Sequence, residues 1–122
     1  MNPDARHSIV SPLMVWEIIT FPAEVDISNS ARLGSELLAA FRPGGTVVIA
    51  DMSRTAFCDS FDTRRLLIAN DRAGENLAQL RVVVATANVL RVLRLTGVDQ
   101  VLDIYPSLPK ALADSAPVVP RS

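Results

Sequence analysis

The stretch TVVIADMSRTAFCDS, residues 46–60, begins with a continuous apolar run and ends where a helical pattern starts. Residues 46–51 have the composition of a strand that is buried on both faces of a parallel sheet. LRVVVA at 80–85 is a second run of this kind, and MVWEIIT at 14–20 and VLDIY at 101–105 are further runs rich in β-branched residues. We therefore expect a strand at each of these four places.

Helical patterns lie between the expected strands. In residues 29–41, leucines and a phenylalanine recur at helical spacing, and the RPGG that follows ends the pattern. A stripe from Thr63 to Leu77 predicts a second helix. Thr86 is expected to cap a third helix and Gly97 to end it in a left-handed conformation. Ser107 is expected to cap a last short helix.

Strands that alternate with helices of this length predict an α/β fold with crossover helices. Residues 7–13 are expected to pair with the strand at 14–20 as a hairpin arm. The prediction is one domain over residues 1–122, with a mostly parallel central sheet of about five strands and about four helices. Its core spans 14–113, and 114–122 form a flexible tail.

Composition excludes several classes of function. The chain of 122 residues is 49% hydrophobic with a net charge of −1, and it shows no basic patch for nucleic acid. We expect no signal peptide, because residues 1–10 contain no long apolar run behind a basic start, and no stretch approaches the ~18 apolar residues that a membrane helix needs. A single cysteine and a single histidine argue against a metal site, and no glycine-rich phosphate loop indicates a cofactor. The lone Cys58 fits the reducing cytoplasm.

Three stretches, AEVD at 23–26, TVVIADMSRTAFCDS at 46–60 and LRLTGVDQVLDIYPSLPKAL at 93–112, resemble motifs of the STAS-domain family of bacterial anti-sigma factor antagonists. The 46–60 stretch is similar to the family's apolar strand ending in Asp, short loop, and Asp-Ser at a helix start. AEVD at 23–26 resembles its Gly-Glu-hydrophobic-Asp, and LRLTGVDQVLDIYPSLPKAL at 93–112 resembles its closing stretch. The resemblance covers about residues 14–113 and implies a single STAS-like domain.

The resemblance implies partner switching in transcription regulation. Such a protein is not an enzyme: it binds an anti-sigma factor that is also a serine kinase, and this frees a sigma factor. The kinase phosphorylates the serine after Asp, here Ser60, and the phosphorylated form lets go. Glu24 and Asp26 match acids in a neighbouring loop. The implied partner-binding residues are Glu24, Asp26, Asp59, Ser60, Phe61 and Asp62.

A phosphate at this place is physically reasonable. The start of a helix has free N–H groups and the positive end of the helix dipole, so it accommodates the added charge of about −1.5 to −2. The simpler interpretations are that Asp59 or Ser60 only caps the helix, and that Glu24 and Asp26 are solvated loop acids.

The chain departs from the family pattern directly after the serine. The family usually has Ser or Thr and then Gly, whereas this chain has Phe61 and Asp62. Glycine lets another backbone approach closely, and Asp62 instead adds a side chain and a negative charge. A second hypothesis is therefore a STAS interaction scaffold that phosphorylation does not switch. The sequence leaves both a monomer and a homodimer open.

The enzyme alternative rests on Cys58 and Arg64. Their spacing and their place at a strand-to-helix junction match the protein tyrosine phosphatase loop, and a helix start lowers a thiol pKa. The intervening residues 59–63 contain two acids and no glycine, which opposes binding of a phosphate dianion. The other interpretation is a thiol that packs as a small hydrophobe.

Overall fold

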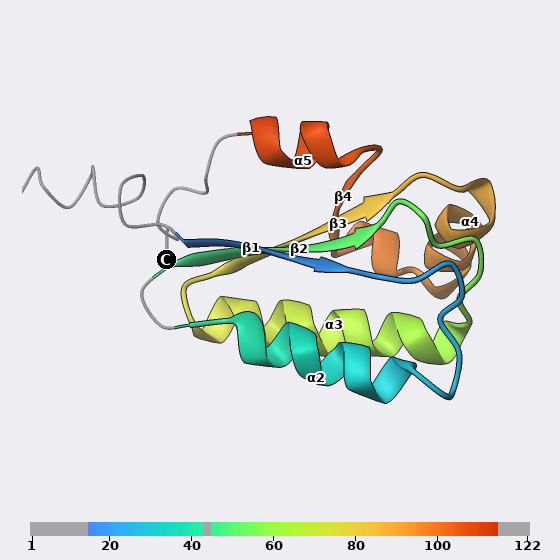
Figure 1. Ribbon diagram of the computed structural model, residues 1–122, viewed down its shortest axis with the longest axis horizontal. Helices are drawn as coiled ribbons and strands as arrows, with labels where there is room; N and C mark the ends of the chain where they lie inside the picture. Colours follow the sequence, from blue (N-terminus) through green and yellow to red (C-terminus); the bar gives the residue numbers. More distant parts are fainter. Residues whose placement is uncertain (1–14, 43–44, 115–122) are drawn as a thin grey trace, which may run out of the picture.

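The computed structural model describes residues 15–42 and 45–114, and for residues 60 and 61 it describes the backbone alone. The elements in chain order are β1 (Val15–Thr20), α2 (Ser30–Ala40), β2 (Thr46–Met52), α3 (Ser60–Glu75), β3 (Gln79–Val84), α4 (Ala87–Thr96), the 3₁₀ turn η1 (Val98–Gln100), β4 (Asp103–Tyr105) and α5 (Leu108–Ala113) (Figure 1). The alternation of strands and helices is confirmed. The hairpin arm expected at 7–13 and residues 115–122 of the tail expected at 114–122 lie outside the described residues, whereas Asp114 is described and bonds to Arg81 and Tyr105.

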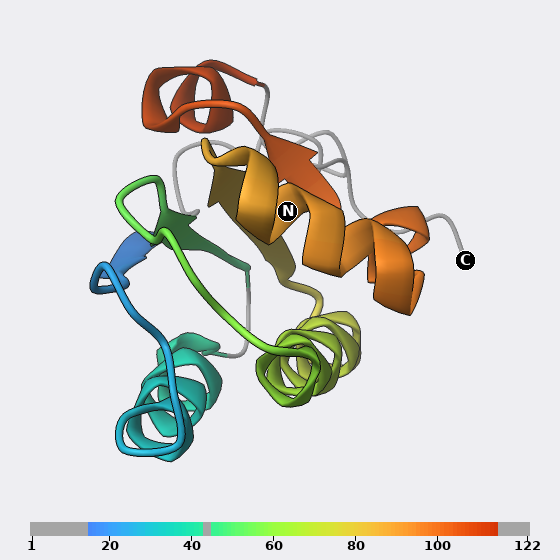
Figure 2. The ribbon, with the colours of Figure 1, turned by 90° about the vertical axis from the view of Figure 1, so that its right-hand side faces the viewer.

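The four described strands form one parallel sheet in the order β1-β2-β3-β4. α2, α3 and α4 cover one face, and α5 covers the other (Figure 2). Every residue of β2 is buried, as its continuous apolar run predicts. Because all the strands run the same way, their carboxyl ends meet at one edge of the sheet, and the loops that carry the candidate residues start there.

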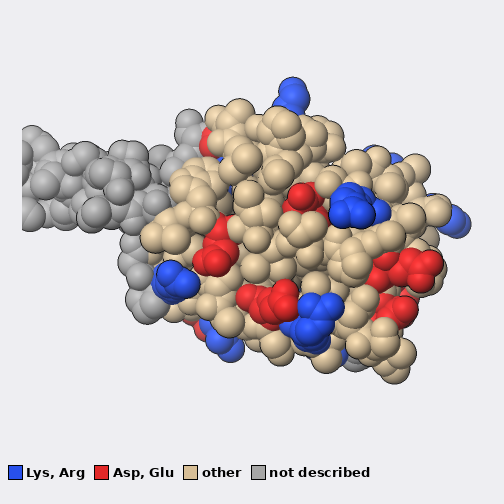
Figure 3. All heavy atoms as spheres, viewed as in Figure 1, with Lys and Arg blue, Asp and Glu red and all other residues tan. Residues whose placement is uncertain are grey.

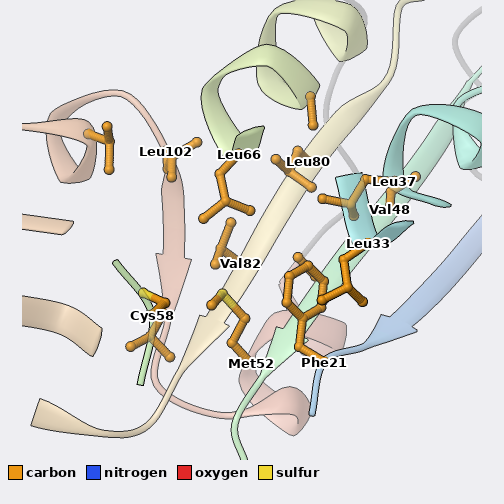
Figure 4. Packing of buried hydrophobic residues seen from close by; sticks show 14 of the residues in the cluster. Phe21, Leu33, Leu37, Val48, Met52, Cys58, Leu66, Leu80, Val82 and Leu102 are labelled. Atoms are coloured by element: carbon orange, nitrogen blue, oxygen red, sulfur yellow. The ribbon is translucent and has the colours of Figure 1, made fainter. Parts of the chain in front are cut away.

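The main core lies between the sheet and the three helices. Leu33 and Leu37 of α2, Leu66 of α3 and the inward residues of β2 and β3, such as Val48 and Val82, interdigitate there (Figure 4). A smaller cluster under α5 contains Val47, Ile49, Val83 and Ala111. The period of two along β2 and β3 divides their side chains between these two clusters.

Two sequence-based details were wrong. Thr86 precedes α4, but its side chain makes no cap hydrogen bond; its Oγ1 donates instead to the Thr55 carbonyl at 2.9 Å. Leu77 does not continue the α3 stripe, because α3 ends at Glu75. Leu77 takes the left-handed conformation with a φ of 55° and is 58% exposed, while the Ala78 N–H closes the helix end on the Ala73 carbonyl.

Two other helix-end predictions are confirmed. Gly97 follows α4 with a φ of 81°, a conformation that favours glycine. Ser107 caps α5 by accepting from the Lys110 N–H at 3.3 Å. Both residues act through their own local backbone, which is why the sequence alone indicates their roles.

Candidate functional site

The loops that follow β1 and β2 are joined backbone to backbone. Glu24 and Phe57 form a parallel bridge, with the Val25 N–H donating to the Phe57 carbonyl at 3.1 Å. The Ala56 N–H donates to the Ala23 carbonyl at 2.8 Å. The pairing of the two strands thus continues into their loops, and the segment with Glu24 lies beside the segment that leads to Asp59.

Hydroxyl groups connect these loops further. Thr55 is fully buried, and its Oγ1 donates to the Pro22 carbonyl at 2.8 Å. The Thr86 hydroxyl, from the loop after β3, donates to the Thr55 carbonyl. The loops after three adjacent strands are therefore tied into one unit by partly buried hydrogen bonds.

Asp26 organises the turn before α2. Its Oδ1 accepts from the Ser28 N–H at 2.9 Å and from the Ser28 hydroxyl at 2.6 Å, and its own N–H donates to Asn29 Oδ1 at 3.0 Å. The Ser28 hydroxyl is the main reason that the pKa of Asp26 is lowered. Asp26 therefore stays ionised at neutral pH while it shapes the turn, which holds Ile27 in solvent with 92% of its surface exposed.

Asp59 and Asp62 form a reciprocal cap at the start of α3. Asp59 Oδ1 accepts from the Asp62 N–H and Asp62 Oδ2 accepts from the Asp59 N–H, each at 3.0 Å. Asp62 is only 6% exposed, and burial raises its pKa, while a hydrogen bond from Ser30 acts in the opposite direction. Asp59 therefore caps α3, which is part of the simpler interpretation of this stretch. The charge that Asp62 adds to the family pattern is turned inward, into the helix start.

Ser60 and Phe61 are the first two residues of α3 by their backbone, and their side chains lie outside the described part of the structure. The phosphorylation of Ser60 and the partner contacts of both residues stay predictions. The backbone does place Ser60 at a helix start next to Asp59, as the sequence predicts.

Glu24 differs from the other candidate acids. It is exposed, and within 15–42 and 45–114 no hydrogen bond or ion pair engages its carboxylate. Acidic side chains gather at the right-hand end of Figure 3, where Figure 1 draws the loops after β1 and β2. Of the predicted partner-binding acids, Glu24 is therefore the one whose carboxylate has no structural task among the described residues.

Cys58 is built into the core. It is 2% exposed, and burial raises the pKa of its thiol to about 11, with smaller contributions from the charges of Asp62 and Asp59 (Figure 4). Arg64 is exposed on α3. A thiol that stays protonated at neutral pH is a poor nucleophile, so this arrangement supports packing and opposes the phosphatase alternative.

The part of the structure described here shows no group of side chains suited to hold a metal ion. The cavity between α2 and α3, lined by Phe21, Leu37, Cys58 and their neighbours, has a volume of about 10 Å³. That is at most room for a single water molecule. None of the described helices has the length and apolar character needed to cross a bilayer.

Sequence reasoning missed Arg81, which is 1% exposed in β3. Its guanidinium lies 5.2 Å from the Trp16 ring and 5.5 Å from the Tyr105 ring. Nη1 donates to the carbonyls of Ala111 at 2.7 Å and Asp114 at 3.0 Å, so Arg81 holds the end of α5 on the sheet. A charged residue inside the buried run at 80–85 was the available signal, since a buried charge needs partners.

The fold and the candidate site together define a small α/β domain whose candidate surface consists of interlocked loops at one edge of a parallel sheet. The sequence model of the STAS domain family matches residues 14–111. The chain belongs to the STAS domain family.

Solved structures share this fold. One is an anti-sigma-factor antagonist (STAS) domain protein from Planctomyces limnophilus, with a TM-score of 0.69 and 23% identity over 78% of this chain and 86% of the other. Another is an anti-sigma factor antagonist from Mycobacterium paratuberculosis, with a TM-score of 0.67 and 23% identity over 78% and 80% of the two chains. A comparison with curated proteins found no match.

Proposed function

We propose that this chain is an anti-sigma factor antagonist of the bacterial cytoplasm. It binds an anti-sigma factor with serine kinase activity and so releases a sigma factor. Membership of the STAS domain family and the two antagonists with the same fold support this proposal. The observation that carries it is the position of the Asp59–Ser60 helix start beside the acidic loop, joined through the Glu24–Phe57 bridge.

Phosphorylation of Ser60 is the proposed switch. A serine kinase places the terminal phosphate of its nucleotide and a catalytic carboxylate close to the hydroxyl that it modifies. A phosphate already present on Ser60 adds about −1.5 to −2 charge at that point and is repelled by both groups. The helix start accommodates the phosphate within the antagonist itself, so the switch acts on binding and spares the fold.

The test uses each purified serine-kinase anti-sigma factor encoded by the same bacterium. The protein is incubated with the factor, ATP and Mg²⁺, and phosphate is located by mass spectrometry. We expect one phosphate on Ser60 and none in Ser60→Ala, with Ser60→Ala binding like the wild type in calorimetry. Ser60→Asp should bind about tenfold more weakly, since a carboxylate carries about half the phosphate charge.

A second candidate is a STAS scaffold that phosphorylation does not switch. The Asp59–Asp62 cap favours it, because Asp62 stands where the family has glycine and its N–H already bonds to Asp59. A phosphate on Ser60 would add negative charge to a helix start that already carries the carboxylates of Asp59 and Asp62, and the Asp62 N–H there is already bonded to Asp59. Tight binding of the anti-sigma factor without phosphate on any residue would select this scaffold over the switch.

A further inference from the structure

Two large apolar side chains stand out from the joined loops at the carboxyl edge of the sheet. Ile27 is 92% exposed and Phe57 is 54% exposed. They come from the two segments that the Glu24–Phe57 bridge connects. Val25 and Cys58, their close neighbours along the chain, are each 2% exposed. The same loops therefore send some apolar side chains into the core and hold these two in solvent.

The exposed position of Ile27 is imposed by the turn. Asp26 binds both the N–H and the hydroxyl of Ser28, and the Asn29 side chain donates to the Glu24 carbonyl at 2.9 Å. The segment around Phe57 is held by two hydrogen bonds, one from the Val25 N–H to the Phe57 carbonyl and one from the Ala56 N–H to the Ala23 carbonyl. A surface fixed in this way loses little conformational entropy when a partner covers it, and this favours affinity.

The charges around the apolar pair indicate the kind of partner. The loops at 21–29 and 53–59 carry three acids, Glu24, Asp26 and Asp59, against one base, Arg54. Glu24 adjoins Phe57 through the bridge and is exposed. Apolar anchors with a charged rim are typical of binding surfaces, and an acidic rim pairs with Lys or Arg.

We infer that Ile27 and Phe57 anchor the interface with the anti-sigma factor, and that the factor presents an apolar socket rimmed by Lys or Arg. This inference rests on the proposed function and names the chemistry of its partner. The basic rim meets the acids of the loops, whereas the kinase centre meets the helix start at Ser60. Affinity then depends on Ile27 and Phe57, and the association rate depends on Glu24.

The chain contains a matched control for Ile27. Leu95, on α4, is 74% exposed. Figure 2 shows α4 on the opposite flank from the loop after β1. Ile27→Ala and Leu95→Ala remove similar exposed side chains, so both variants should melt at the wild-type temperature. A difference between them in binding then reports the interface and not the stability of the fold.

The test measures binding to each purified serine-kinase anti-sigma factor of the same bacterium by surface plasmon resonance at two salt concentrations. We expect Ile27→Ala and Phe57→Ala each to weaken binding about tenfold or more, through faster dissociation, and Leu95→Ala to change it less than about twofold. Glu24→Lys should slow association at low salt and flatten its salt dependence, since it reverses a rim charge.

Three outcomes would overturn the inference. A factor that binds Ile27→Ala and Phe57→Ala as tightly as the wild type would show that the anchors lie elsewhere. The proposed function would then stand without this inference. If Leu95→Ala causes the larger loss, the interface is on the α4 flank. If no factor binds the wild type, the proposed function itself fails and the inference fails with it.

Discussion

Replacing Asp59 or Asp62 by alanine removes one half of the reciprocal cap at the start of α3. Asp59→Ala takes away the acceptor of the Asp62 N–H, and Asp62→Ala takes away the acceptor of the Asp59 N–H. Each single variant keeps the other hydrogen bond, because that bond ends on a backbone N–H that the substitution leaves in place. The two variants and their double mutant therefore separate the two bonds.

The expected cost follows from this geometry. Loss of a helix N-cap costs about 1 kcal/mol of unfolding free energy, in a range of about 0.5–2 kcal/mol. For a domain of this size that corresponds to a fall in melting temperature of about 3–5 °C. Asp62→Gly should cost about 2 kcal/mol, because glycine inside a helix adds about 1 kcal/mol to the lost bond. Asp62→Gly introduces the glycine that is usual in the family. It therefore tests partner binding only under conditions in which the variant remains folded.

The pH dependence of the Asp62 contribution has a definite sign. Burial raises the pKa of Asp62 in the folded protein above its ordinary value of 3.8. The stability gained by protonating Asp62 is fully present below that ordinary value and is lost as pH rises through the raised one. The free energy of unfolding of Asp62→Asn should therefore fall further below that of the wild type as pH falls from 7 to 3.

The assay is urea unfolding followed by circular dichroism and by the fluorescence of the single tryptophan, Trp16. Asp71→Ala is the control, since Asp71 is an exposed acid on the same helix. We expect the midpoints of unfolding of Asp59→Ala and Asp62→Ala to lie at lower urea concentrations than that of Asp71→Ala. If all three share the wild-type midpoint, the reciprocal cap contributes nothing and the structural role given to Asp62 is wrong.

Two further predictions concern buried groups. Cys58, with a thiol pKa of about 11, should react with an aromatic disulfide reagent at pH 8 about a hundredfold more slowly than a free thiol until urea unfolds the chain; rapid stoichiometric labelling of the native protein would refute its burial. Arg81→Met should lower the free energy of unfolding by about 2–4 kcal/mol and expose α5 to proteases, because it removes the hydrogen bonds and ring contacts of the guanidinium. The exposed Arg91→Met is its control, and equal unfolding midpoints for the two variants would reject the anchoring role.

Local sequence was enough to predict the alternation of strands and helices. The apolar run at 46–51 became the fully buried β2, and the left-handed Gly97 and the cap at Ser107 appeared where their residue types indicated. These features depend on apolar periodicity or on hydrogen bonds within a few residues, and both are properties of a short segment. The family resemblance placed Glu24 and Asp26 in a loop neighbouring Asp59, and the two loops meet in the structure because parallel strands end at a common edge.

Only the tertiary structure decided which partner each polar group takes. Thr86 was a reasonable helix cap, yet its hydroxyl bonds to Thr55, which is far along the chain and near in space. Arg81 likewise found an acceptor at the end of α5, in the Ala111 carbonyl, 30 residues further along the chain. Polar side chains have several partners of similar energy within reach, and packing chooses among them because an unpaired buried group is costly. The sequence by itself therefore determined where the strands and helices lie, and the folded chain decided which polar side chains are engaged in structural hydrogen bonds and which, like the Glu24 carboxylate, stay exposed among the described residues.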